Sequence, residues 1–97
     1  SRDKWIVSIV TKMEVLSKPA LASEEKRFLS DFLSKCKVIG LSRRVVKETI
    51  RLRSRINRKL PDSVIAATAV LAKATLISND LHLLSASYPG LLVEPFK

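Results

Sequence analysis

The stretch that decides the fold is Leu60-Pro61-Asp62-Ser63-Val64-Ile65-Ala66-Ala67-Thr68-Ala69, followed by Thr75-Leu76-Ile77 and then Ser78-Asn79-Asp80. Pro61 disfavours a helical conformation for the residue before it, and Asp62 has the side chain of a helix N-cap. Residues 64–74 are small or apolar on nearly every side, which is typical of a buried helix. Residues 75–78 then have the apolar, partly β-branched character of a buried parallel strand.

Two acids flank this helix and strand. Asp80 lies just beyond the expected strand, and Asp62 lies at the start of the helix before it. Ligands of parallel sheets gather beyond the carboxyl ends of the strands, and paired carboxylates suit a hard divalent cation. The same acids also fit structural roles, Asp62 as a helix cap and Asp80 as a turn residue. The residues alone leave both interpretations open.

The rest of the chain alternates short apolar runs with helical patterns. Further strands are predicted at residues 5–10, 38–41 and 91–93. A helix capped by Thr11 is expected after the first strand, with Glu14 in its first turn; that position suits either a ligand or an acid favoured by the helix dipole. Ser23 is expected to cap a longer helix that buries Phe28 and Phe32. This alternation predicts an α/β sandwich with a mostly parallel sheet flanked by helices.

Most of the positive charge lies in one helix predicted to follow Ser42. The formal net charge is +9 over 97 residues, and residues 43–59 hold eight basic side chains against one acid, Glu48. The basic residues that recur at helical spacing share one predicted face and are Arg44, Lys47, Arg51, Arg55 and Arg58. Such a face is either solvated or binds a polyanion, and the concentration of charge in one element favours nucleic acid or an acidic partner.

The composition argues against several classes of protein. With 46% hydrophobic residues the chain is expected to fold as one small domain rather than to be disordered. No apolar run is long enough to span a membrane, and the single Cys36 cannot form an internal disulfide, so a cytoplasmic setting is expected. The lone His82 has no partner at zinc-ligand spacing.

Three segments of the sequence resemble a known family. They are Val7-Ser8-Ile9-Val10-Thr11-Lys12-Met13-Glu14-Val15-Leu16, then Lys59 to Ala69, and Thr75-Leu76-Ile77-Ser78-Asn79-Asp80. Together they resemble PIN-domain nucleases, most closely the VapC-like toxins of prokaryotic toxin–antitoxin pairs. The Leu-Pro-Asp segment with its Ala-Ala-Thr-Ala continuation is the most specific of the three.

The resemblance implies an acidic cluster that holds Mg²⁺ or Mn²⁺ and cleaves RNA. Glu14, Asp62 and Asp80 fall on three of the family's acidic positions, and Ser78 stands where the family often has a supporting Ser or Thr. A bound cation of this kind activates water and stabilises charge on the phosphate. The resemblance also implies RNA as the substrate, an antitoxin-like protein as a partner, and a homodimer.

One departure from the family concerns its first strand, which carries an acid in an Asp-x-Asn pattern, and the helix that follows. Neither has a counterpart here, so residues 1–97 are expected to be a single, N-terminally incomplete PIN-like domain. The leading interpretation is a metal-dependent endoribonuclease that cleaves poorly or not at all as this chain alone. The alternative is a non-catalytic basic module that binds an antitoxin-like protein or RNA.

Overall fold

A computed structural model describes residues 5–95, whose helices and short strands divide into two compact units, one up to residue 40 and one from residue 41 onward. Each unit contains one pair of parallel strands. The predicted α/β class with parallel strands is therefore confirmed, with the strands distributed over two pairs.

The first unit consists of strand β1 (Ile6–Ser8), helix α1 (Ile9–Leu16), helix α2 (Ser23–Ser34) and strand β2 (Lys37–Ile39). Strands β1 and β2 are parallel, with Val7 opposite Val38. Helix α1 begins directly after β1 because the Ser8 side chain accepts a hydrogen bond from the Val10 backbone N–H at 3.1 Å. The strand is therefore shorter than predicted, and Thr11 lies inside the helix rather than at its cap.

Helix α2 buries a narrower stripe than its sequence predicts. Its N-cap is Ala22, and Ser23 is already helical. Leu33 is buried, whereas Phe28 and Phe32 are 71% and 42% exposed. The prediction that both aromatics belong to the core is wrong. Helix α2 contacts α1 and β2, and Phe28 and Phe32, four residues apart, form the row of the helix next to the one that contains the buried Leu33.

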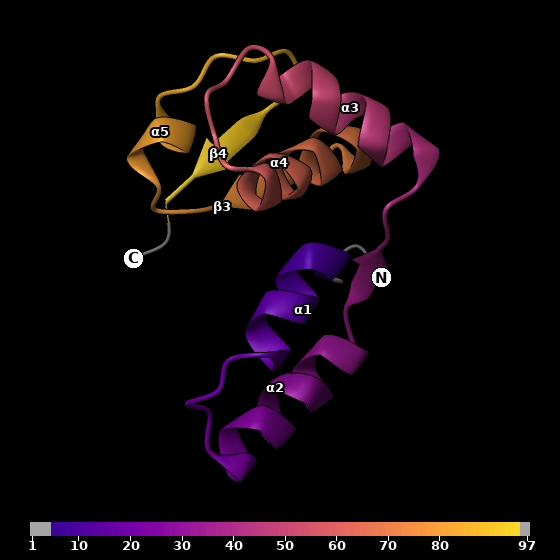
Figure 1. The fold of residues 1–97 in the computed structure, drawn as a ribbon, viewed down its shortest axis with the longest axis vertical. Helices are drawn as coiled ribbons and strands as arrows, with labels where there is room; N and C mark the ends of the chain where they lie inside the picture. Colours follow the sequence, from indigo (N-terminus) through magenta and orange to yellow (C-terminus); the bar gives the residue numbers. More distant parts are fainter. Residues whose placement is uncertain (1–4, 96–97) are drawn as a thin grey trace. The chain divides into compact units, whose positions relative to one another are not determined.

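The second unit consists of helices α3 (Arg43–Arg53) and α4 (Leu60–Ala72), strand β3 (Thr75–Ile77), helix α5 (Leu81–Leu84) and strand β4 (Leu92–Glu94). Strands β3 and β4 are parallel, with Leu76 opposite Val93. Helix α4 packs beside α3 (Figure 1). The buried cluster of this unit contains Leu52, Ile56, Ala66, Leu83 and Tyr88.

Helix α4 is largely buried, as its composition predicts. Ala66 and Ala67 are both 0% exposed, and side chains this small let the helix approach its neighbours closely. The helix ends at Lys73, whose φ of 54° is left-handed, and the Ala74 N–H donates to the Ala69 carbonyl at 3.0 Å. This reversal at the C-terminus directs the chain into β3.

Helix α3 begins as predicted and ends earlier. The Ser42 side chain accepts a hydrogen bond from the Val45 N–H at 3.2 Å, which caps the helix. Ser54 is the C-cap, so residues 54–59 form a non-helical segment that leads to α4. This segment is held by Arg53, whose Nε donates to the Arg58 carbonyl at 3.2 Å.

Tyr88, Pro89 and Gly90 form a tight turn before β4. The Leu91 N–H donates to the Tyr88 carbonyl at 3.0 Å, and Gly90 has a φ of 85°. Proline and glycine at the two central positions, with positive φ at the glycine, are the features of a type II turn. The turn precedes β4 and fixes Tyr88 against the core of the second unit.

Candidate functional site

The second unit brings two predicted site residues together around one arginine. Arg58 Nη2 donates to Asp62 Oδ2 at 3.0 Å and to Asp80 Oδ2 at 2.5 Å. The side chains of Arg58, Asp62 and Asp80 are 18%, 35% and 25% exposed, so all three are partly shielded from water. Asp62 and Asp80 therefore direct one oxygen each at a common positive group.

Asp80 is positioned by the way β3 ends. It is the N-cap of α5, where its Oδ1 accepts hydrogen bonds from the backbone N–H groups of His82 at 2.8 Å and Leu83 at 3.4 Å. The Ser78 hydroxyl accepts from the Asp80 N–H at 3.1 Å, and the Ser78 N–H donates to the Glu94 carbonyl at 2.9 Å. These bonds fix one carboxylate oxygen to the backbone and leave Oδ2 for Arg58.

Asp62 contacts Arg58, the partner of Asp80, from the first turn of α4. The prediction that it is the N-cap is wrong, because α4 begins at Leu60, Lys59 is the N-cap and Pro61 lies within the first turn. Proline is well tolerated there, where its missing N–H costs no helical hydrogen bond. In the first turn a carboxylate is still favoured by the helix dipole, and its side chain lies four residues after Arg58.

The environment of Asp80 favours its charged form. Desolvation raises its pKa, but the hydrogen bonds from the His82 and Leu83 backbone and the charge of Arg58 together hold the pKa below the ordinary value of 3.8. Asp80 is therefore ionised at neutral pH. An ionised carboxylate beside a second one is the state in which the pair can bind a cation.

The carboxylate oxygens of Asp62 and Asp80 are of the ligand type that binds hard divalent cations. Two carboxylate oxygens contact the same cationic nitrogen of Arg58, and carboxylate oxygens are the ligands that Mg²⁺ and Mn²⁺ prefer. Among residues 5–95 no group of three or more carboxylate, imidazole or thiol side chains gathers to form a metal site. Within the second unit the structure therefore brings together a pair of acids.

Glu14 belongs to the first unit. Its prediction as a first-turn residue is wrong, because α1 starts at Ile9 and no acid lies in its first turn. Glu14 is exposed on the second half of that helix. Its role as a third ligand remains a prediction.

The predicted basic face is divided by the early end of α3. Arg44, Lys47 and Arg51 lie on the helix and are exposed, and Arg55 is exposed in the segment that follows. Arg58 is not part of this exposed surface, because its guanidinium lies between the two aspartates. The prediction of one continuous helical face that includes Arg58 is wrong, whereas nucleic-acid contact by the exposed members stays a prediction.

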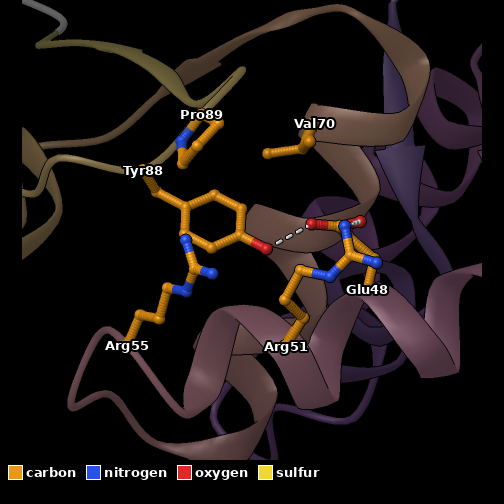
Figure 2. Close-up of a pocket in the computed structure, with 6 residues that line it drawn as sticks. All are labelled: Glu48, Arg51, Arg55, Val70, Tyr88 and Pro89. Carbon is orange, nitrogen blue, oxygen red and sulfur yellow. Dashed lines mark hydrogen bonds and ion pairs between the residues drawn. The ribbon is translucent and has the colours of Figure 1, made fainter.

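A second group of residues is not evident from the sequence. Figure 2 shows Tyr88 and Glu48 directed toward one another. They line a hollow of about 320 Å³ together with Arg51, Arg55, Val70 and Pro89. The Tyr88 hydroxyl donates to Glu48 Oε2 at 2.6 Å. Glu48 is the only acid within residues 43–59 and Tyr88 is the only tyrosine of the chain, but neither fact indicates that the two side chains meet.

In the part of the chain that the structure describes, none of the helices combines the length and apolar character needed to cross a lipid bilayer.

Comparisons with known proteins agree with this fold. No curated protein matches the chain significantly. A chain of a toxin–antitoxin complex from Klebsiella pneumoniae is similar at 30% sequence identity and a TM-score of 0.70, covering 88% of this chain and 69% of that one. A chain of the VapBC2 complex from Rickettsia felis, solved with a DNA fragment from its promoter, has 22% identity and a TM-score of 0.78, covering 97% and 76%. A model of the PIN domain matches residues 1–87, so the chain belongs to the PIN-domain family.

Proposed function

We propose that this chain is a metal-dependent endoribonuclease of a toxin–antitoxin pair. The observation that carries the proposal is the convergence of Asp62 and Asp80 on one cationic nitrogen, at the start of α4 and just beyond β3. Family membership supports it, because PIN domains generally use divalent metal ions. The similar solved chains come from toxin–antitoxin complexes, which supports an antitoxin-like partner for this chain.

Each residue of the site has a proposed role. Asp62 and Asp80 would hold Mg²⁺ or Mn²⁺, with Glu14 as a third acid, and a bound cation of this kind lowers the pKa of its water and stabilises charge on a phosphate. Ser78 positions Asp80 through the bond that its hydroxyl accepts from the Asp80 N–H. Arg58 offsets the repulsion between the two carboxylates and keeps them facing one another. The exposed basic residues Arg44, Lys47, Arg51 and Arg55 would bind the RNA backbone.

A second candidate function is a non-catalytic module that binds RNA or an antitoxin-like protein. One observation favours it: the Arg58 guanidinium already contacts both acids and offsets one of their two negative charges. The exposed positive charge of α3 serves binding whether or not catalysis occurs.

The test measures RNA cleavage and metal binding in parallel. The chain is incubated with single-stranded RNA in Mg²⁺, in Mn²⁺ and in EDTA, and Mn²⁺ binding is followed by paramagnetic broadening of backbone amide signals. Asp62→Asn and Asp80→Asn should abolish cleavage and the broadening around both residues. Asp31→Asn is the matched control, because Asp31 is an exposed acid on α2 that pairs with Lys35, also exposed, at 3.5 Å.

The outcomes separate the two functions. Metal-dependent cleavage that is lost in the two site variants and kept in the control supports the nuclease. A folded chain that binds RNA in EDTA, neither cleaves it nor binds Mn²⁺, and is unaffected by Asp62→Asn would identify the basic binding module instead. Light scattering on the same samples tests the expected homodimer.

A further inference from the structure

The hollow beside Tyr88 belongs to the second unit and is partly open to solvent. It lies where the end of α3, helix α4 and the turn at residues 88–91 meet, and its volume of about 320 Å³ is several times the roughly 30 Å³ of a water molecule in the liquid. Figure 2 shows the guanidinium groups of Arg51 and Arg55 beside the ring of Tyr88 and the carboxylate of Glu48. The hollow therefore has room for a ligand group and charged side chains to meet it.

The charges around the hollow leave a positive excess. Arg51 and Arg55 contribute two cations against the single carboxylate of Glu48, whose side chain is only 12% exposed. Both oxygens of that carboxylate are engaged, Oε2 by the Tyr88 hydroxyl at 2.6 Å and Oε1 by Arg51 Nη1 at 3.8 Å. Burial and the neighbouring Glu48 raise the pKa of Tyr88, so the phenol stays neutral and adds no negative charge.

These contacts distinguish between the parts of a nucleotide that could bind. Tyr88 is 7% exposed and Arg55 lies over its ring at 5.9 Å, so the ring is a wall of the hollow and is not open for stacking on a base. The side chain of Arg51 is 66% exposed and lines the hollow, and its guanidinium carries further N–H donors besides Nη1, which pairs with Glu48. Guanidinium groups match the oxygens of a phosphate in geometry and charge, which makes a phosphate the better ligand.

We propose that Arg51 and Arg55 form a phosphate-binding subsite, held in place by the Tyr88–Glu48 pair, for the backbone of the RNA substrate. This inference rests on the proposed function and adds the place where the strand is held. Arg55 precedes Arg58 by three residues within the 54–59 segment, so their Cα atoms are at most about 11 Å apart. A strand bound in the subsite is thus kept within a few nucleotides of the acid pair.

The first experiment probes the subsite in the unmodified chain. Inorganic phosphate, adenosine monophosphate and a short single-stranded RNA are titrated separately in EDTA, and NMR follows the backbone amides and the arginine side-chain N–H signals. All three ligands should shift the signals of Arg51, Arg55 and Tyr88 in a saturable manner. Binding of the free ions but not of RNA would show a nucleotide or phosphate site unrelated to the strand, and would overturn the assignment to the RNA backbone.

A pair of double variants with equal loss of charge supplies the control. Arg51→Gln with Arg55→Gln should abolish the phosphate-induced shifts, and the slope of log affinity against log salt for RNA should become shallower by about 0.7 for each phosphate that is no longer neutralised. Arg44→Gln with Lys47→Gln removes the same charge from the exposed part of α3 and should leave the shifts at Tyr88 intact. Equal effects of both pairs would show a diffuse basic surface and refute a defined subsite.

The remaining outcomes also decide between partners. If a poly-glutamate peptide shifts Arg51 and Arg55 while phosphate and RNA do not, the hollow binds an acidic protein segment and the proposal fails. Because the titrations contain no metal, their result is independent of cleavage. Saturable phosphate binding in a chain without nuclease activity would support the subsite and refute the proposed enzyme. Active cleavage without shifts at the hollow would support the enzyme and refute the subsite.

Discussion

Replacing Tyr88 with phenylalanine tests whether the Tyr88–Glu48 pair holds the second unit together. The substitution keeps the ring in the core and removes only the hydroxyl that donates to Glu48 Oε2 at 2.6 Å. A hydrogen bond to a charged group contributes about 1.5–3 kcal/mol. Because Glu48 is 12% exposed and can regain some hydration, we expect a loss of about 1.5 kcal/mol, near the lower end of that range. For a domain of this size the melting temperature should fall by roughly 6–12 °C.

The same pair makes stability depend on alkaline pH in a defined direction. Burial, followed by the hydrogen bond and charge of Glu48, raises the pKa of Tyr88 above its ordinary value of 10.0 in the folded chain. The unfolded chain therefore loses the phenolic proton first. The stabilisation from this shift is complete below pH ~10 and disappears as the pH rises through the higher pKa of the folded state. The Tyr88→Phe variant should lack this loss.

Both effects are measurable because Tyr88 is the only tyrosine of the chain. The near-ultraviolet absorbance of phenolate reports its titration directly, and urea unfolding at a series of pH values gives the free energy of unfolding for the two proteins. Glu48→Gln is the matched control, because it keeps a hydrogen-bond acceptor and removes the charge, and it should return the Tyr88 pKa partway toward 10.0. A folded chain whose Tyr88 titrates at its ordinary value, with equal stability of the phenylalanine variant, would refute the reasoning.

Three further substitutions test other parts of the fold. The pKa of Asp80 lies below 3.8 in the folded chain, so its stabilisation is present above that pH and is lost as the pH falls through the lower pKa of the folded state; urea unfolding of Asp80→Asn should show a weaker acid dependence. Ala67 is 0% exposed, and Ala67→Leu should overpack its surroundings and cost about 1–3 kcal/mol in chemical denaturation, whereas no change would contradict that burial. Gly90 has a φ of 85°, and a Cβ there would lie 3.3 Å from Val70 Cγ1. Gly90→Ala should therefore lower stability by about 1–2 kcal/mol, and calorimetry that shows an unchanged melting temperature would argue against the strained turn.

Patterns within a short stretch of sequence predict the elements whose formation depends mainly on neighbouring residues. The apolar composition of residues 64–74 predicts the buried helix α4. The meeting of Asp62 and Asp80 follows from the order of one helix and one strand, and the structure brings them together. The predicted cap positions are less accurate: Ser8 rather than Thr11 caps α1, and the N-caps of α2 and α4 are Ala22 and Lys59, which make no side-chain cap hydrogen bond.

The contacts that the sequence does not reveal join residues far apart in the chain. Helical spacing of basic residues continues beyond Arg53, and without a glycine or proline at that point the periodicity alone does not show that α3 ends. Arg58 pairs with Asp80, which is 22 residues away, and Tyr88 pairs with Glu48 at a separation of 40. Such pairings depend on how α3, α4 and the strands pack, so no local pattern predicts them.

The early end of α3 has a direct consequence for the site. If the helix continued through Arg58, the basic side chains would share one solvent-facing surface, and Asp62 and Asp80 would repel one another without a cation between them. Instead the 54–59 segment leaves Arg55 over the ring of Tyr88 and places Arg58 between the two acids. The segment is fixed by Arg53 Nε on the Arg58 carbonyl and by Ser63 Oγ on the Lys59 carbonyl at 2.9 Å. One short, tethered segment therefore supplies a cation to the acid pair and another to the hollow, which is why both sites depend on where α3 ends.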